Sequence, residues 1–341
     1  MIASPDRRPF DDVRHLVATL PSGDTSAAIT ARSRQVELTK PAGSLGRLED
    51  IAVWLATWGG GRAIAVNRPL AAIFAGAHGV AARGVSAYPS AVNAQMLANF
   101  SQGGAAINQL CKTFDISLRV FDLAVDIPTG DICDGPAMSE RDCAANMAFG
   151  MEALAGEPDL LCLGDMGIGN TTAAAAIYAA LWGGGATAWV GAGTGVDADG
   201  LTRKTDAVET ALATHSGHLG DPLAVLARLG GREIAAIAGA ILAARHQRVP
   251  VILDGYVTTA AAAVLHALRP DALDHCLAAH CSAEKAHANV LERLGLKPLL
   301  SLDMRLGEAS GAALAVSIVR GAAALHSGMA TFAEAGVSGC L

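Results

Sequence analysis

Short apolar runs alternate with longer alanine-rich segments along most of this chain, and that alternation restricts its fold more than any other feature. The runs have the length and composition of buried strands, and the segments between them have the length of helices. Strands that alternate with helices predict an α/β fold with a mostly parallel, Rossmann-like sheet covered by helices on both faces. We expect strands at 70–75, 116–123, 160–163, 188–190, 249–253, 275–279 and 298–302.

The expected helices lie between these runs and also before the first of them. Residues 1–60 are helical in character, with helices at 26–35 and 48–58 and a turn and helix cap at 21–24. The Trp-Gly-Gly-Gly cluster at 58–61 breaks the second helix and marks a boundary. The other expected helices are 91–111, 137–155, 171–182, 203–214, 232–246, 256–268, 284–294 and 308–324.

Almost every expected strand is followed by Gly, Asp or His, as at Asp254 and His280. Ligands of parallel sheets bind at the carboxyl ends of the strands, so we expect the functional site there. At His78 and His280 a functional and a structural role are equally compatible with the sequence. His215 and His218 stand in a turn flanked by Ser and Gly, which predicts surface positions.

Composition excludes several classes of protein. Apolar residues make up 52% of the 341 residues and aromatic residues only 4%, so small aliphatic side chains must fill the core. The net charge of −7 argues against nucleic acid or an anionic membrane as partner.

The longest apolar run, 234–244, is shorter than the roughly 18–20 residues that span a bilayer. Because the N-terminal segment also lacks the apolar core of a signal peptide, we expect a cytoplasmic protein. A composition this apolar also fits an oligomer with a buried helical interface.

The seven cysteines are spread through the chain, and none forms a C-x-x-C pair. That pattern predicts reduced thiols that behave as small buried apolar residues. The cluster of His275, Cys276, His280 and Cys281 has a spacing that matches no common zinc site. We therefore expect no metal.

The sequence GDMGIGNTT at 164–172 joins an expected strand to an expected helix. Gly167 and Gly169 would let backbone N–H groups approach an anion, and the start of the helix would add unpaired donors. Thr171 and Thr172 would add hydroxyl donors. The loop is not a Walker motif, because no Gly-Lys-Ser/Thr follows. An ordinary turn capped by Asn170 or Thr171 is the alternative.

A second glycine loop, GAGTG, occupies 191–195. It is not a dinucleotide fingerprint, because Val196 stands where a third glycine is required. Two such loops at neighbouring strand ends could hold one phosphate from two sides. Lys204 either adds a positive charge to that site or is a solvated helix lysine.

The third motif, DMRLGEASG at 303–311, places Glu308 at the start of an otherwise apolar helix. From the residues alone, a favourable helix N-terminal charge explains it as well as a catalytic role does. Ser310 and Gly311 would permit a close neighbour. Arg305 reads more readily as one half of a structural ion pair than as a site residue.

Seven motifs appear together in one order: KPAGSLGRLE, GVSAYP, GDMGIGNTT, GAGTG, LDGYVTTAAA, HCSAEKAH and DMRLGEASGAALA. In this set the chain resembles the nicotinate-nucleotide–dimethylbenzimidazole phosphoribosyltransferase family over nearly its full length. The resemblance implies a homodimeric pentosyltransferase of cobalamin lower-ligand synthesis that needs no metal or organic cofactor. It also implies a small helical domain from both chain ends, 1–60 plus 305–341, and a large α/β substrate-binding domain, 61–304.

The implied reaction moves the phosphoribosyl group of nicotinate mononucleotide to 5,6-dimethylbenzimidazole. It yields α-ribazole 5′-phosphate and nicotinate, with inversion at the anomeric carbon. Glu308 is implied as the base that removes the proton of the attacking benzimidazole. Burial beside an aromatic ring would raise its pKa and a helix N-terminus would lower it, and the sequence does not decide between them.

The resemblance also assigns substrate contacts. It places the 5′-phosphate on Gly167, Gly169, Asn170, Thr171, Thr172, Gly193, Thr194, Gly195 and Lys204. It places the apolar base beside Met166, Leu306 and the segment 86–95, where Ser86, Tyr88 and Gln95 are candidates. Tyr88 is equally compatible with an ordinary core position.

Three positions depart from the family pattern. Asp165 stands where the family usually has Glu, Ala77 where it commonly has Asp or Asn, and Ala192 where Arg is frequent. They leave the reaction class intact and the choice of base open. Two other functions remain: a hydrolase in which water replaces the base, and a non-catalytic nucleotide-binding or sensing module. The module would keep both glycine loops without needing Glu308.

Overall fold

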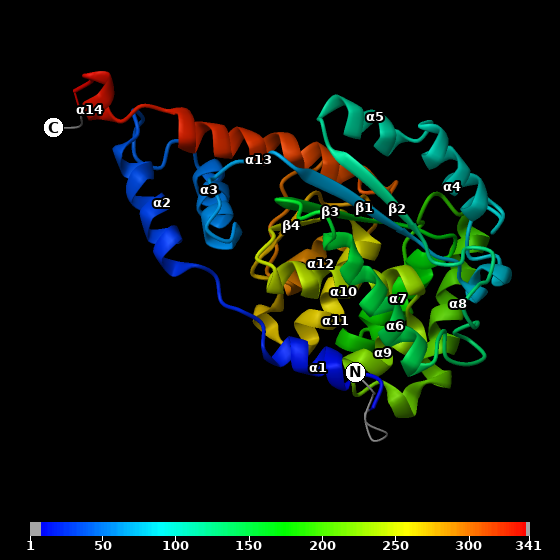
Figure 1. Ribbon diagram of the computed structural model, residues 1–341. Coiled ribbons are helices and arrows are strands. Elements are labelled where there is room, and N and C mark those ends of the chain that lie inside the picture. Colours follow the sequence, from blue (N-terminus) through cyan, green and yellow to red (C-terminus); the bar gives the residue numbers. More distant parts are fainter. Residues whose placement is uncertain (1–7, 339–341) are drawn as a thin grey trace.

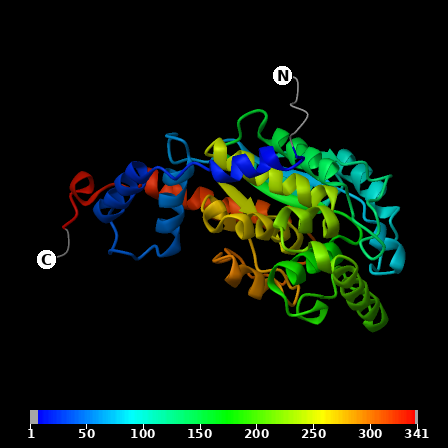
Figure 2. The ribbon, with the colours of Figure 1, turned by 90° about the horizontal axis from the view of Figure 1, so that it is seen from below.

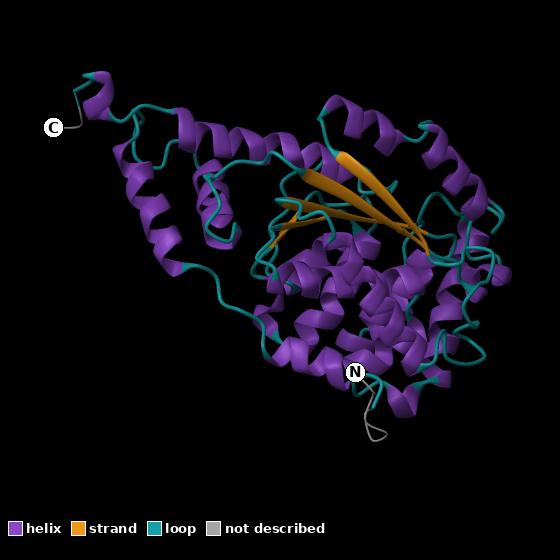
Figure 3. Cartoon of the chain, in the orientation of Figure 1, coloured by secondary structure: helices purple, strands orange, loops and turns teal. Residues whose placement is uncertain are grey.

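A five-stranded parallel sheet lies at the centre of the molecule, between two layers of helices (Figures 1 and 3). The structure is a computed structural model and describes residues 8–338. Its strands run in the order β2-β1-β3-β4-β5 and confirm the predicted α/β class. They are β1 (Pro69–Ala75), β2 (Ser117–Asp122), β3 (Leu160–Met166), β4 (Val251–Leu253) and β5 (Cys276–Ala278).

The direction of winding changes at β1, which pairs with both β2 and β3. β1 is buried along its whole length, with Leu70, Ala72 and Phe74 facing one helical layer and Ala71 and Ile73 the other. Burial on both faces explains why the sequence of β1 is a continuous apolar run. The change of direction leaves a crevice at the carboxyl ends of β1 and β3, the usual ligand position in such sheets.

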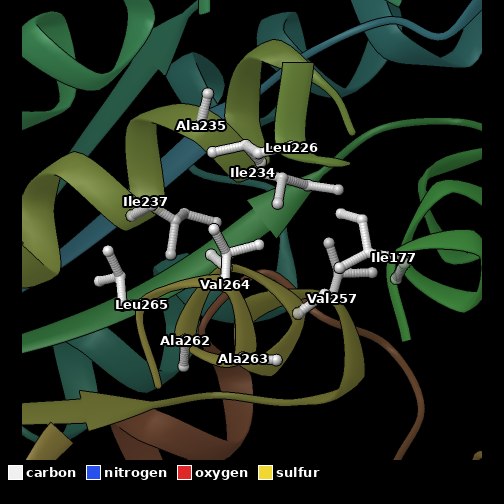
Figure 4. Packing of buried hydrophobic residues seen from close by; sticks show 14 of the residues in the cluster. Ile177, Leu226, Ile234, Ala235, Ile237, Val257, Ala262, Ala263, Val264 and Leu265 are labelled. Atoms are coloured by element: carbon white, nitrogen blue, oxygen red, sulfur yellow. The ribbon is translucent and has the colours of Figure 1, made fainter. Parts of the chain in front are cut away.

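The larger helical layer covers one face of the sheet and carries most of the alanine-rich sequence. Figure 4 shows how Ile234 and Ile237 of one helix pack among Val264 and Leu265 of another and Leu226 of a third. Small side chains let the helices approach closely, as the composition predicted. This layer contains α6 (Glu140–Met151), α7 (Asn170–Trp182), α8 (Ala198–Thr214), α9 (Pro222–Leu229), α10 (Arg232–His246), α11 (Tyr256–Leu268) and α12 (His287–Arg293).

Two glycines bring α6 and α10 of this layer into close backbone contact. A Cβ atom at Gly150 would overlap the carbonyl of Ala236, and one at Gly239 would overlap the carbonyl of Met147. Any side chain at either position would push the two backbones apart, so the small residues here are a requirement of packing.

The opposite face is covered mainly by α13 (Ser310–Gly328), α3 (Arg47–Trp58), α4 (Val92–Gln102) and α5 (Ala106–Thr113). Beyond the sheet, α2 (Thr25–Glu37) packs on α3, and the far end of α13 continues into α14 (Phe332–Ala335) (Figure 2). Arg34 of α2 ties these ends together by donating to the carbonyls of His326 and Met329.

The first helix, α1 (Asp11–Ala18), lies against the α/β body, apart from α2 and α3. Arg269 donates to the carbonyl of Val17, and Val13 and Val17 belong to the same apolar cluster as α10 and α11. The division at residues 60 and 305 therefore stays a prediction, and α1 packs with the larger part.

Several local predictions are wrong. Residues 188–190 form no strand, because Ala188 ends the 3-10 turn η3 (Ala186–Ala188) and the chain curves there after three glycines. The indole N–H of Trp189 donates to the carbonyl of Gly183. The run 298–302 makes only a single bridge, between Leu300 and His280. The expected helix 91–111 is two helices, because Gly103 adopts a left-handed conformation. Further 3-10 turns are η1 (Gly79–Arg83), η2 (Glu152–Leu154), η4 (Ser216–His218) and η5 (Pro270–Leu273).

The surface position predicted for His215 is also wrong. His215 is buried against the carbonyl of Ile132, and burial lowers its pKa, whereas His218 is exposed as predicted. Six cysteines are free thiols, and Cys340 lies outside the described residues. Within residues 8–338 no helix is long and apolar enough to cross a membrane, and no cluster of His, Cys, Asp and Glu could hold a metal ion.

Candidate active site

A cavity of about 560 Å³ opens at the carboxyl ends of the strands. Its wall combines the end of β3, the segments that follow β4 and β5, the second glycine loop, the loop before α13 and the start of α4. The lining residues are Tyr88, Val92, Met96, Asp165, Met166, Gly167, Ile168, Asn170, Thr171, Gly193, Thr194, Gly255, Tyr256, Val257, His280, Ser282, Glu284, Arg305, Leu306, Gly307 and Glu308.

The first glycine loop brings the start of α7 to this cavity. The helix is preceded by Gly169 in a left-handed conformation and has no side-chain cap. The expected caps Asn170 and Thr171 are used otherwise: the Asn170 amide donates to Asp165, and the Thr171 hydroxyl accepts from Lys204. The positive end of the helix dipole therefore faces the cavity without a competing side-chain carboxylate or hydroxyl at its cap.

Lys204 joins the two glycine loops. Its Nζ donates to Thr171 Oγ1 at 2.8 Å and to the carbonyl of Gly191 at 3.0 Å, and the side chain is only 1% exposed. A solvated helix lysine is therefore excluded. Burial lowers the pKa of Lys204 to about 8, against the opposing effect of Glu284.

Gly193 of the second loop is left-handed, with φ of +56°. A Cβ atom there would stand 3.2 Å from both Lys204 Nζ and Thr171 Oγ1, so the position admits glycine far better than any other residue. Arg305 Nη1 donates to the carbonyl of Gly193 at 3.0 Å. Arg305 thus braces this loop, and the ion pair expected for it is wrong for the described residues.

Glu308 enters the cavity from a tight turn. Glu308 and Ala309 both adopt left-handed conformations, with φ of +60° and +58°, immediately before α13. Ala309 packs directly on β3 because residue 164 is a glycine, where a Cβ atom would overlap Ala309. The Glu308 N–H donates to the Asp165 carbonyl at 3.1 Å. Backbone strain of this kind is concentrated at functional sites.

The Glu308 side chain is 5% exposed, and its Oε2 has no hydrogen-bond partner among the described residues. Burial, and then the charge of Asp165, raise the pKa of Glu308 to about 7. Of the two opposing effects expected from the sequence, burial prevails. A carboxyl with this pKa exchanges a proton readily near neutral pH.

Asp165 is a second buried acid beside Glu308. Its Oδ2 accepts from Asn170 at 2.8 Å and its Oδ1 from Thr258 at 3.3 Å. Burial and then the charge of Glu233 raise the pKa of Asp165 to about 7, despite these hydrogen bonds. Both of its oxygens are occupied, so Asp165 is less free than Glu308 to take a proton from a ligand.

The two histidines after strands differ in position. His280 lines the cavity, packs on Gly311 and has its Nδ1 3.8 Å from Asp254 Oδ1. His78 lies outside the lining and pairs with the buried Glu233 at 2.6 Å. The structure thus gives His280 access to a ligand and His78 a structural position.

Ten of the predicted site residues share the cavity wall: Tyr88, Asp165, Met166, Gly167, Asn170, Thr171, Gly193, Thr194, Leu306 and Glu308. Tyr88 is 52% exposed, which excludes the core alternative. The other six predicted residues, outside the lining itself, are Ser86, Gln95, Gly169, Thr172, Gly195 and Lys204.

Sequence reasoning gave no role to Asp254, Ser282 and Glu284. The fully buried Asp254 accepts the N–H of Ala312 at 2.9 Å and so holds the start of α13 behind Glu308. Burial raises the pKa of Asp254 well above its ordinary value. The sequence signal for Asp254, Ser282 and Glu284 was their position after two strands, within the motifs LDGYVTTAAA and HCSAEKAH.

Comparison with known proteins identifies the family. A family model described as "Phosphoribosyltransferase" matches residues 20–337. A protein of Rhizobium meliloti (strain 1021) named nicotinate-nucleotide–dimethylbenzimidazole phosphoribosyltransferase is 64% identical over 330 residues, which cover 97% of this chain and 97% of that protein. The chain belongs to this phosphoribosyltransferase family.

Solved structures agree with this assignment. The crystal structure of CobT from Thermus thermophilus matches with a TM-score of 0.85 and 44% identity, over 92% of this chain and 99% of that one. A second structure from the same organism, titled as the nicotinate-nucleotide–dimethylbenzimidazole enzyme, has a TM-score of 0.84 at 42% identity, over 93% and 100% of the chains. The phosphoribosyltransferase fold therefore extends over nearly the whole chain.

Proposed function

We propose that this chain transfers the phosphoribosyl group of nicotinate mononucleotide to 5,6-dimethylbenzimidazole, giving α-ribazole 5′-phosphate and nicotinate in cobalamin lower-ligand synthesis. The observation that carries the proposal is the buried Glu308 carboxyl, which shares one cavity with two glycine loops joined by Lys204. The names of the relatives support the choice of substrates.

The reaction needs one proton acceptor. The bond between C1′ and the nicotinate nitrogen breaks, and its electron pair stays on the nitrogen, so the positively charged pyridinium leaves as a neutral ring nitrogen. A benzimidazole nitrogen forms the new bond to C1′, and the proton on its other nitrogen passes to Glu308. A base of pKa about 7 suits this step, and its negative charge favours an oxocarbenium-like transition state.

The two glycine loops are proposed to bind the 5′-phosphate. The start of α7 and Lys204 supply positive electrostatic potential, and backbone N–H groups supply donors. The flat apolar base is proposed to lie at the other end, against Met166, Leu306 and Tyr88, with Met96 beside them. Ser86 and Gln95 remain candidates at the edge of this pocket.

A homodimer in the cytoplasm completes the proposal. Leu302, Leu306 and Tyr88 are large apolar side chains that stay at least half exposed, and Ile29 and Val36 are exposed along α2. Covering such side chains with a second copy would bury apolar area. Light scattering of the purified chain measures its mass and separates a dimer from a monomer.

Glu308→Gln tests the function. The variant should bind nicotinate mononucleotide normally and lose about 10²–10⁴-fold in turnover, the usual contribution of a general base. Glu292→Gln, on the exposed face of α12, is the matched control and should keep full activity. Products are followed by mass spectrometry with nicotinate mononucleotide and a panel of bases.

Each outcome separates one alternative. An unchanged rate in Glu308→Gln contradicts the assigned base. Nicotinate release without a new riboside favours the hydrolase, and nucleotide binding without any nicotinate release favours the sensing module.

A further inference from the structure

The segment after β5 presents alternate side chains to the cavity. His280, Ser282 and Glu284 all line it, while Cys281 and Ala283 between them do not. The backbone bends at Ala283 and Glu284 before the turn into α12, so the three side chains reach the cavity from a short curved segment. The proposed reaction uses none of these three side chains.

The backbone of this segment is held rigidly. The Ser282 N–H donates to His287 Nδ1 at 2.8 Å, and His287 Nε2 lies 3.2 Å from the hydroxyl of Thr259. Nδ1 is therefore the acceptor and Nε2 carries the hydrogen. Burial lowers the pKa of His287 to about 3, so the ring stays in this neutral form at physiological pH. The Ala283 N–H donates to the Met304 carbonyl at 2.9 Å, which ties the segment to the loop that carries Glu308.

Glu284 places a carboxylate beside the anion-binding end of the cavity. The residue is 6% exposed, and its Oε2 is buried without a hydrogen-bond partner in the part of the chain that the structure describes. A Cβ atom built at Gly193 would stand 4.0 Å from Glu284 Oε1 and 3.2 Å from both Lys204 Nζ and Thr171 Oγ1. Lys204 donates to Thr171 and Gly191, and among the described residues no hydrogen bond joins it to Glu284, although the charge of Glu284 acts on it.

The chemistry of this position excludes a phosphate contact. An ionised carboxylate only accepts hydrogen bonds, and it repels a phosphate oxygen. Its natural partner is a hydroxyl group. In a mononucleotide that lies with its phosphate on the glycine loops and its reacting C1′ near Glu308, the ribose spans the space between them. The ribose hydroxyls are the donors that such a carboxylate can accept, as acidic side chains do in dinucleotide sites.

We propose that Glu284 accepts a hydrogen bond from the ribose 2′-hydroxyl of the bound nucleotide and thereby selects the ribonucleotide over its 2′-deoxy analogue. This inference rests on the proposed function, because it uses the nucleotide and its orientation. It makes Glu284 a specificity-determining residue of the donor site. A purely structural role, in which Glu284 only supports Lys204 electrostatically, would affect both nucleotides equally.

The test compares nicotinate ribonucleotide with nicotinate 2′-deoxyribonucleotide at saturating dimethylbenzimidazole. Glu284→Ala should lower kcat/KM for the ribonucleotide roughly 10–100-fold, the value of a hydrogen bond to a charged group. It should leave kcat/KM for the deoxy analogue within about threefold, so the preference collapses. Glu284→Gln keeps an acceptor of the same shape and should retain part of the preference. Glu292→Ala, on exposed α12, should leave both values unchanged.

Equal losses for the two nucleotides in Glu284→Ala would overturn the inference and leave Glu284 as a support for the loop. A wild-type enzyme without preference for the ribonucleotide would overturn it as well. Calorimetric binding of both nucleotides to the same variants gives the preference as a ratio of dissociation constants. If the wild type binds them but transfers nothing, the proposed function fails while this ratio still decides the role of Glu284.

Discussion

The two ends of the cavity are built in opposite ways. The anion end consists of backbone from two glycine loops, one helix start and the buried cation Lys204. The carboxylate end consists of two buried acids, Asp165 and Glu308, on a strained turn and the end of a strand. Burial acts on both ends, lowering the pKa of Lys204 to about 8 and raising those of the acids to about 7.

The comparison shows how one physical cause prepares a site for a dipolar substrate. Desolvation disfavours any charge, so burial moves the pKa values of these groups toward neutral pH. A ligand of opposite charge then stabilises the charged form of each group. Nicotinate mononucleotide carries a phosphate anion at one end and a pyridinium cation at the other. The proposed orientation places each group beside the protein charge that it stabilises.

Removal of the Lys204 charge is the strongest test of the difference between the two ends of the cavity. Lys204→Met keeps most of the buried volume but deletes the charge and leaves the Thr171 hydroxyl and the Gly191 carbonyl without their donor. We expect the dissociation constant of nicotinate mononucleotide to rise about 10–100-fold, as for loss of a charged hydrogen-bonding group. Affinity for dimethylbenzimidazole should be unchanged. Isothermal calorimetry measures both.

Lys112→Met is the control for this substitution. Lys112 is exposed on α5 and lies outside the cavity lining, so its removal changes the net charge equally without touching the site. Equal weakening by both variants would mean that Lys204 acts only through the overall charge.

The second test uses the pH dependence of the two ends. Transfer requires Glu308 deprotonated and Lys204 protonated, so kcat/KM for the nucleotide should rise as the pH passes about 7 and fall beyond about 8. Below the acid limb the rate should fall about tenfold per pH unit. Lys204→Met should lose the alkaline limb and keep the acid one. A profile of the wild type that is flat from about pH 5.5 to about pH 9 would contradict the assignment of both groups.

The anion end was easier to predict from the sequence than the rest of the site. Glycine spacing between an apolar run and a helix is local information, and it identified Gly167 and Thr171 correctly as neighbours of a cavity. The burial of Lys204 was not local, because helical position alone does not distinguish a solvated lysine from one covered by another loop. Glu284 was missed for the same reason: only the fold brings it next to Gly193.

The prediction of the fold succeeded where a strand is uniformly buried, and it failed where an apolar run is not a strand. β1 and β4 are buried on both faces and apolar throughout, and β3 is apolar over its first four residues, before Gly164 and Asp165. The run at 188–190 is apolar because Trp189 packs in a cluster with Tyr178 and Trp182. Three residues give too short a period to separate a buried turn from a strand.

The smallest expected effect concerns the coupling of the two acids. Asp165→Asn keeps an oxygen for the Asn170 amide and can donate to the Thr258 hydroxyl, but it removes a negative charge beside Glu308. Because that charge is the lesser of the two causes that raise the pKa of Glu308, the acid limb of kcat/KM should move down by about half to one pH unit. Near pH 6 the variant should therefore lose less activity, relative to its own maximum, than the wild type.

The same substitution has a signature in stability that does not depend on turnover. A carboxyl whose pKa rises from 3.8 in the unfolded chain to about 7 in the folded one stabilises the fold at low pH, and this contribution is lost as the pH rises through 7. The amide that replaces the carboxyl cannot titrate, so the Tm of Asp165→Asn relative to wild type should be higher at about pH 8 than at about pH 5. Asp206→Asn, exposed on α8, should show no such trend. A Tm difference for Asp165→Asn that is constant with pH would mean that burial does not hold Asp165 protonated, and the acid end would then be charged throughout.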